Sequence, residues 1–269
     1  MEITSENYFK LKEQKLSRAE IANNLNIPEW KLKRLISANG WGKPASIIEF
    51  EDTFSYYDEY SCYWAGFLAA DGNVDSKKRV RLMLKYDDIT HLEKFKELIG
   101  STHTISSNTD KYNRCSFEFT NTKIWQDLQD NFYIIPNKTN KLKLPEHLGS
   151  NMVHYIRGYF DGDGSICESF SNKNSVTSSI YATFCSGCVD YANSLFSYLN
   201  KELGVQGHNQ VFENKNQIKY NTNDAKILLS WMYKDSTVYL DRKYLLYKRL
   251  VEENIRTTRV LDKGIVQSS

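Results

Sequence analysis

The sequence predicts an α+β fold made of two similar halves. Two apolar, aromatic segments, "YWAGFLAADGNV" (63–74) and "YIRGYFDGDGSI" (155–166), share one outline, and each contains an Asp-Gly near its end. Strand-like and helix-like stretches alternate after each of them. A repeated segment indicates an internal repeat. Strands punctuated by helices, without strict β-α-β spacing, favour antiparallel sheets packed with helices.

The composition is that of a globular protein with a large core. Of 269 residues, 41% are hydrophobic and 13% are aromatic. The formal net charge is only +2, so a nucleic-acid partner must be argued from local patterns. We find no apolar run approaching the roughly 20 residues of a membrane span, and no signal-peptide core. With five scattered cysteines, we expect reduced thiols in a cytoplasmic protein (bacterial, phage or organellar interior) that is not secreted and not membrane-bound.

The N-terminal residues 1–40 predict a small helical module. Ser17 is an N-cap for a first helix, with Glu20 at capping-box spacing. Pro28 opens a second helix, and Gly40 ends it. Two short helices joined by a tight turn form a helix-turn-helix, whose second helix would meet DNA. Its basic side chains are Lys31, Lys33 and Arg34. The alternative is a plain helical hairpin that packs on the main body.

The remaining chain divides into a linker, two halves and a tail. We expect the linker at 41–52, the first half at 53–154, the second at 155–257 and a loose polar tail at 258–269. The first half predicts a helix ending at Asp71, then, in order, a strand at 79–86, a helix at 88–100, a hairpin and a helix near 122–132. The second half predicts a helix ending at Asp163, then a strand near 180–186, a helix at 191–204, strands near 206–212 and 217–221, a helix near 223–232 and a basic helix at 239–255. Each half reads αββαββα, with one strand weakly marked.

The two repeated helices carry small residues at matching places. Gly66 matches Gly158, and Ala70 matches Gly162. Glycine lowers helix propensity by roughly 1 kcal/mol relative to alanine, so matching glycines indicate a packing requirement. Small residues let two helix backbones approach closely. We therefore expect these helices to pack against each other, with the two terminal aspartates side by side.

Aspartates at that position require a counter-charge. The helix dipole places partial negative charge at a C-terminus, and two adjacent carboxylates repel each other. A divalent cation reverses the balance, and oxygen ligands of this kind suit Mg²⁺. A metal held by two acids can activate a water for attack on a phosphodiester.

The repeated segments "WAGFLAADG" and "IRGYFDGDG" resemble the two copies of the LAGLIDADG motif. The chain resembles a single-chain, two-motif LAGLIDADG homing endonuclease over about residues 53–257, and "PNKTNKLKLP" and "YLDRKYLLYKRL" add to the likeness. The resemblance implies two pseudo-symmetric αββαββα halves whose antiparallel sheets form a saddle over a long DNA site. It implies a monomeric, site-specific endonuclease that hydrolyses both strands of double-stranded DNA and promotes the mobility of an intron or intein.

The resemblance also implies roles for individual residues. Asp71 and Asp163 would hold two or three Mg²⁺ ions between them, assisted by the main-chain carbonyls of Ala70 and Gly162. A basic residue would lie near each scissile phosphate. The candidates are Lys138 and Lys243, with Lys141 and Arg242 as near-equal rivals. The earlier acid of the motif is Asp161 in the second copy but Ala69 in the first, so Asp161 receives no catalytic role.

The strand at 79–86 predicts a DNA-contact face. Arg79, Arg81, Met83 and Lys85 alternate with Val80, Leu82 and Leu84, which gives one basic and one buried face. An ordinary solvated strand usually mixes charge signs, so this face favours contact with the major groove. Further expected DNA contacts are Lys111, Arg114, Lys173, Gln210 and Lys219.

Two other functions remain open on the same fold. An intron-RNA maturase would bind RNA and would not need both acids, although this chain keeps both. A nuclease-inactive DNA-binding regulator is favoured by the helix-turn-helix segment.

Overall fold

The computed structural model describes residues 3–41, 46–108, 112–170, 176–212 and 216–258. The chain separates into two compact units, residues 1–46 and 47–269. Lys111, Lys173 and all but the first residue of the predicted tail lie outside the described residues. None of the described helices combines the length and the apolar character that crossing a membrane requires.

The smaller unit is a three-helix module with its own core. Its helices are α1 (Ser5–Glu13), α2 (Arg18–Asn24) and α3 (Glu29–Ala38). The Ser17 hydroxyl accepts from the Glu20 backbone, and the Glu20 side chain accepts from the Ser17 backbone, which confirms the predicted capping box. Pro28 precedes α3, and Gly40 follows it with φ +65°. The core consists of Tyr8, Leu11, Ile21, Ala22, Leu25 and Leu32.

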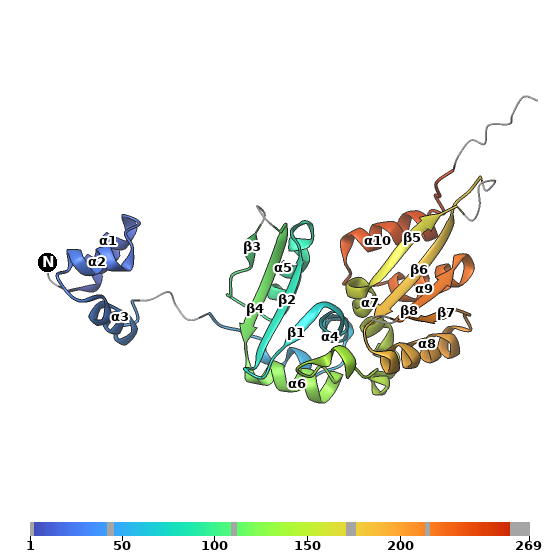
Figure 1. Ribbon diagram of the computed structural model, residues 1–269, viewed down its shortest axis with the longest axis horizontal. Helices are drawn as coiled ribbons and strands as arrows, with labels where there is room; N and C mark the ends of the chain where they lie inside the picture. Colours follow the sequence, from blue (N-terminus) through green and yellow to red (C-terminus); the bar gives the residue numbers. More distant parts are fainter. Residues whose placement is uncertain (1–2, 42–45, 109–111, 171–175, 213–215, 259–269) are drawn as a thin grey trace, which may run out of the picture. The chain divides into compact units, whose positions relative to one another are not determined.

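The larger unit contains two rounds of the same element order (Figure 1). The first round is α4 (Glu59–Asp71), β1 (Gly72–Val74), β2 (Arg79–Lys85), α5 (Ile89–Leu98), β3 (Ser106–Asn108), β4 (Arg114–Thr120) and α6 (Thr122–Phe132). The second is α7 (Met152–Asp163), β5 (Gly164–Ser169), β6 (Ser179–Ser186), α8 (Val189–Leu203), β7 (His208–Val211), β8 (Asn216–Asn221) and α9 (Thr222–Tyr233), followed by α10 (Asp241–Tyr247).

Each round forms one four-stranded antiparallel sheet. The strand order is β1-β2-β4-β3 in the first half and β5-β6-β8-β7 in the second. The identical order confirms the predicted α+β fold of two αββαββα halves. The weakly marked strand is the first of each round, which begins at the glycine directly after Asp71 or Asp163.

The helices α4 and α7 pack side by side between the two sheets (Figure 1). A Cβ atom on Gly66 would lie 1.9 Å from the carbonyl oxygen of Tyr155, and one on Gly158 would lie 1.8 Å from that of Tyr63. No side chain fits at such distances, so both glycines are required for the close approach. The predicted reason for the matching glycines is confirmed.

Two boundaries differ from the sequence expectation. The larger unit begins at Ile47 rather than near residue 53, because the Ile47 backbone bonds to Thr102 and Glu49 donates to the Gly100 carbonyl. Short main-chain pairings of this kind leave no sustained period in the sequence. The closing helix is also interrupted, since α10 ends at Tyr247 and a π-helical turn, Lys248–Glu252, follows it.

Candidate active site

Two carboxylates lie at the adjoining ends of α4 and α7. Asp71 is the last residue of α4, and Asp163 is the last residue of α7. A Cβ atom on Gly162 would lie 2.5 Å from the Ala70 Cβ and 3.4 Å from the Asp71 Oδ2. The close packing of the two helices therefore brings the Asp71 carboxylate against the last turn of α7.

Both carboxylates are costly to ionise in this position. Desolvation, and then the neighbouring Asp71 carboxylate, raise the pKa of Asp163 to about 6. Desolvation also raises the pKa of Asp71, although Lys243 and Lys138 oppose it. Asp71 is exposed on one side. The ends of α4 and α7 surround its carboxylate on the other side and limit its contact with water. Paired carboxylates with raised pKa values are suited to a hard cation, which would hold both in the charged form.

Lys138 and Lys243 cap the ends of the same two helices. Lys138 Nζ donates to the carbonyl oxygens of Ala69 (2.6 Å) and Ala70 (3.2 Å). Lys243 Nζ donates to those of Phe160 (2.5 Å), Asp161 (2.9 Å) and Gly164 (2.5 Å). Each ammonium group thus meets the negative end of a helix dipole. Burial lowers the pKa of Lys138, and it lowers the pKa of Lys243 to about 8.

The rival basic residues are placed differently. Lys141 is exposed. Arg242 is exposed as well, and its guanidinium pairs with Asp88 at 3.1 Å. Both preferred lysines lie within electrostatic reach of the two aspartates. The Ala70 carbonyl, an expected metal ligand, accepts from Lys138 in this structure.

Asp161 has a set of partners that sequence reasoning did not anticipate. Its carboxylate is 1% exposed and accepts hydrogen bonds from Tyr63, Tyr233 and the backbone of Leu240. Arg157, one helical turn earlier, is equally buried. The available signal was a pair of charged residues four positions apart inside an otherwise apolar segment.

Known structures identify this architecture. No family model matches the chain, and no curated protein matches its sequence. Solved structures do match. The I-LtrWI LAGLIDADG homing endonuclease bound to target DNA aligns with a TM-score of 0.55 and 10% identity, over 74% of this chain and 91% of that one. The homing endonuclease I-WcaI bound to its DNA recognition sequence aligns with a TM-score of 0.53 and 13% identity, over 72% and 90%.

A third similar structure is meganuclease I-SmaMI bound to uncleavable DNA, with a TM-score of 0.52 and 14% identity, over 71% of this chain and 88% of that one. The two sheets and the paired helices of this architecture all lie in the larger unit. The chain has the LAGLIDADG homing endonuclease fold.

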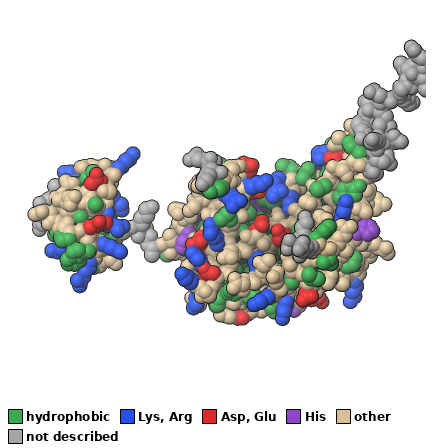
Figure 2. Space-filling model, in the orientation of Figure 1, with side chains coloured by type: hydrophobic (Ala, Val, Ile, Leu, Met, Phe, Trp, Pro, Cys, Tyr) green, Lys and Arg blue, Asp and Glu red, His purple; other side chains and the backbone are tan. Residues whose placement is uncertain are grey.

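In this LAGLIDADG fold, β2 presents the predicted alternation. Its residues Arg79, Arg81, Met83 and Lys85 are exposed, and the three between them are buried. Glu118 on β4 lies opposite Arg81 and pairs with it at 3.7 Å and with Arg79 at 3.5 Å. The exposed face of β2 and β4 therefore carries both positive and negative charge at one end. The sequence of residues 77–85 alone does not reveal this. Figure 2 shows Lys and Arg side chains over the larger unit with acidic side chains among them.

The other expected DNA contacts are spread over both units. Arg114 on β4 is exposed and lies opposite Lys85. In the second half, Gln210 is exposed, while Lys219 is half-buried with its Nζ 4.0 Å from the centroid of the Tyr181 ring. On α3 of the smaller unit, Lys31, Lys33 and Arg34 are exposed.

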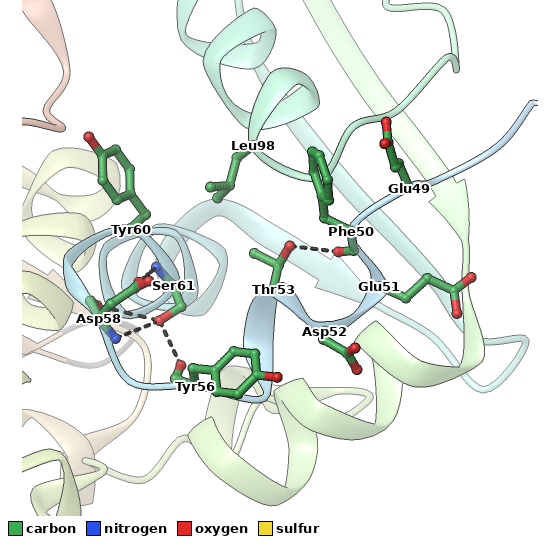
Figure 3. A pocket seen from close by; sticks show the side chains of 10 residues that line it. All are labelled: Glu49, Phe50, Glu51, Asp52, Thr53, Tyr56, Asp58, Tyr60, Ser61 and Leu98. Carbon is green, nitrogen blue, oxygen red and sulfur yellow. Dashed lines mark hydrogen bonds between the residues drawn. The ribbon is translucent and has the colours of Figure 1, made fainter.

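A pocket of about 350 Å³, whose lining Figure 3 shows, lies at the first turn of α4. Asp71 is the last residue of the same helix. The 13-residue helix α4 separates them by roughly 20 Å. Four acidic residues line the pocket together with Phe50, Tyr56 and Tyr60, and no basic residue does. Such a pocket would repel phosphate, so it does not belong to the candidate active site.

Proposed function

We propose that the chain is a site-specific DNA endonuclease that uses a divalent cation to hydrolyse both strands. The observation that carries the proposal is the pair of carboxylates at the adjoining ends of α4 and α7, each with a lysine capping the same helix. Two equivalent acids in two similar halves suit a substrate with two equivalent bonds to break. A duplex with one scissile phosphate on each strand is such a substrate.

The residues at the site fit a divalent cation. Asp71 and Asp163 supply charged oxygens, and Gly162 has no side chain to fill the space between them. Among the described residues no group of three His, Cys, Asp and Glu could hold an ion, so these two acids would be the side-chain ligands. We expect two or three Mg²⁺ ions shared between them. When bound, the metal would activate water and stabilise charge on the phosphate.

The lysines would serve the reaction as fixed positive charges. Lys138 and Lys243 are held at the helix ends by carbonyl groups, so their ammonium groups are already oriented before substrate binds. Preorganised charge of this kind stabilises negative charge that develops on a phosphate. The exposed basic residues of β2 and β4 would hold the duplex across the sheets, and solved structures of this fold contain bound DNA.

The test is strand cleavage with and without Mg²⁺. The substrate is the uninterrupted sequence joined from the two flanks of the intron or intein that would carry this gene. We expect wild-type protein to cut only with Mg²⁺, and Asp163→Asn to lose about a thousandfold in rate while keeping its affinity for DNA. Equal cutting by Asp163→Asn would overturn the assignment of the metal acids.

A second candidate function, a DNA-binding regulator, is favoured by the smaller unit. This unit has its own core and exposes Lys31, Lys33 and Arg34 on α3, a helix suited to the major groove. We therefore propose that it contacts DNA. A variant that lacks residues 1–46 should fold, because the larger unit begins at Ile47. It should bind more weakly, with a shallower salt dependence. Unchanged affinity and slope would exclude a contact role.

The two functions and the maturase alternative give different outcomes. Tight, metal-independent DNA binding without cutting by wild type would support the regulator. Neither binding nor cutting of the joined flanks, together with binding of the intron transcript, would support the RNA maturase.

A further inference from the structure

The helix α7 buries two charged side chains that its counterpart lacks. Arg157 and Asp161 are each 1% exposed and lie four positions apart on one face of α7. The same offset that relates Asp71 to Asp163 places Ala65 and Ala69 at the matching positions of α4. A buried charge is costly unless it is fully partnered, so the partners of these two residues indicate what they hold in place.

Arg157 fastens the connection between α9 and α10 to α4. Its Nη1 donates to the carbonyl oxygen of Met232 at 2.8 Å, and its Nε donates to that of Val238 at 2.9 Å. Its Nη2 pairs with Glu59 of α4 at 2.6 Å. Glu59 also accepts from the backbone of Thr237 at 2.8 Å. The connection is therefore bound at both ends by one guanidinium group.

Asp161 fastens the start of α10. Its Oδ2 accepts from the backbone nitrogen of Leu240 at 2.8 Å, and Leu240 is the residue immediately before the helix. Its Oδ1 accepts from the Tyr233 hydroxyl at 2.5 Å. Lys243 lies in the first turn of α10, with its backbone nitrogen bonded to the Leu240 carbonyl at 3.0 Å. The carboxylate thus holds the turn from which Lys243 reaches back to the end of α7.

Tyr63 extends the same network into the first half. Its hydroxyl donates to Asp161 Oδ2 at 2.8 Å and lies 3.0 Å from His91 Nε2. Because that hydroxyl proton points to Asp161, His91 must donate its own Nε2 proton to the Tyr63 oxygen. Burial lowers the pKa of His91 to about 3, so the ring stays neutral. The network spans α4, α5, α7 and α9 and ends at the first turn of α10.

We propose that Asp161, together with Arg157, is a positioning residue for Lys243, and that the cutting of one DNA strand depends on this support while the cutting of the other does not. The inference rests on the proposed endonuclease function. Lys138 starts a short 3-10 turn, Lys138–Asn140, and α4 offers only Ala65 and Ala69 at the matching places. The two halves thus present the same ammonium group on different supports.

The first experiment measures the cutting of each strand separately, on a duplex with a different fluorophore on each strand. Lys243→Met and Lys138→Met define which strand each lysine serves. Asp161→Asn should slow the cutting of the same strand that Lys243→Met affects. We expect its rate to fall by about tenfold or more, so that nicked duplex accumulates. Equal slowing of both strands would overturn the positioning role. Tyr155→Phe, a buried change on α7 outside the network, is the matched control and should produce no strand bias.

The second experiment needs no nuclease activity. An amine-reactive reagent is applied to the DNA-free protein, and mass spectrometry follows the labelling of Lys243 relative to Lys138. In wild type Lys243 is 2% exposed and should react slowly. Asp161→Asn should raise its labelling about fivefold or more while leaving Lys138 unchanged, since a local support has been weakened. Unchanged labelling of Lys243 would overturn the inference even if wild type cuts DNA.

The two experiments separate the two possible failures. If wild type does not cut but Lys243 labelling responds to Asp161→Asn, the proposed function fails and the positioning role stands. If Asp161→Asn does not fold, Tyr233→Phe removes a single donor from the same carboxylate and should shift Lys243 labelling in the same direction by about twofold. No shift in that folded variant would count against the network.

Discussion

The two halves of the larger unit repeat the chemistry but not the way it is supported. Each half ends its central helix in an aspartate, opens a strand with the next glycine and caps the helix with a lysine. In the second half, Lys243 is 2% exposed and bonded to three carbonyls. In the first half, Lys138 is half-buried and bonded to two.

The sheets differ in the same manner. The first sheet exposes Arg79, Arg81, Lys85 and Arg114, whereas the second presents mainly uncharged side chains around Lys219. The residues that are the same in both halves are the aspartates and lysines at the helix ends. A reaction that breaks two equivalent bonds would need these groups twice. The residues that differ either support the site or, under the proposed function, would face the DNA, which would let one half of the target be distinguished from the other.

The strongest way to break the symmetry is to add a methyl group to one of the paired glycines. Gly66→Ala and Gly158→Ala each place a Cβ within 2 Å of a facing backbone carbonyl. We expect each to destabilise the protein by about 3 kcal/mol or more, because backbone atoms cannot yield as a flexible side chain can. Urea unfolding followed by circular dichroism measures the loss.

The control for this change is Gly204→Ala. Gly204 has φ +65° and ψ +18°, in the left-handed helical region, but no atom lies within 4 Å of its hypothetical Cβ. Its cost should be only about 1 kcal/mol, the cost of the backbone conformation alone. Similar losses at Gly66 and Gly158 would support equal roles in the two halves. A small loss at either one would show that the helices can separate there.

The paired glycines were visible in the sequence because they lie in one short segment that occurs twice. The acids were visible for the same reason, since "ADG" and "GDG" end matching apolar stretches. The alternation of Arg79 to Lys85 predicted β2 and its buried face, which the structure confirms. Local periodicity and repetition therefore account for the fold and for the position of the candidate site.

The supports of the site were not visible in this way. The partners of Asp161 come from Tyr63, Tyr233 and Leu240, which lie far away in the chain and on three different elements. No spacing rule connects them, because their proximity results from the packing of α4, α7, α9 and α10. Glu118 shows the same limitation, since its effect on the basic face arises from strand register and not from sequence neighbours.

A smaller difference between the halves should appear when each lysine is replaced. Lys243→Met removes a donor from three carbonyl oxygens at a buried helix end, of which that of Phe160 still accepts from the Gly164 backbone, whereas Lys138→Met removes a donor from two at a half-buried one. We expect losses of about 2 to 3 kcal/mol and about 1 kcal/mol respectively. Chemical denaturation in metal-free buffer compares them. Equal losses in the free energy of unfolding would contradict the inference that the two lysines are held differently.

The second half also has an acid-sensitive tie between segments far apart in the chain, whereas Asp75 of the first half is held by Arg79 and Lys77 close by in the sequence. Burial alone would raise the pKa of Glu168, but hydrogen bonds from Ser178, the Thr257 backbone and Arg249 outweigh it and lower that pKa to about 2. The matching residue of the first half is Ser76. Because the folded-state pKa lies below the unfolded value, the stabilisation is present above about pH 4.5 and is lost as the pH falls toward 2.

Glu168→Gln should therefore destabilise the protein by about 2 kcal/mol at pH 7 and by progressively less below pH 4.5. Unfolding curves of both proteins across this range measure the difference. Ser76→Ala is the matched control in the first half and should have an effect of less than about 0.5 kcal/mol at either pH. If the loss in the free energy of unfolding of Glu168→Gln did not depend on pH, packing of the side chain and not its charge would stabilise this contact.

The smallest expected difference concerns the two sheet faces. No ion pair in the described part of the chain involves Arg114 or Lys219, and each lies near an aromatic ring, Arg114 at 6.0 Å from the Tyr112 centroid and Lys219 at 4.0 Å from the Tyr181 centroid. If both meet DNA phosphates, Arg114→Gln and Lys219→Gln should each reduce the slope of log affinity against log salt by about 1. If Arg114 instead reads a base edge, Arg114→Gln should weaken binding to the target more than to unrelated DNA.

Binding to the target and to a scrambled duplex, each titrated with salt, separates these cases. Glu118→Gln tests the contribution of the negative charge on this face, because it removes the carboxylate that pairs with Arg79 and Arg81. We expect it to strengthen binding to both duplexes by about threefold, since two guanidinium groups lose a competing partner. Weaker binding to the target alone would instead identify Glu118 as a reader of a cytosine amino group, and the mixed sign of this face would then be part of its specificity.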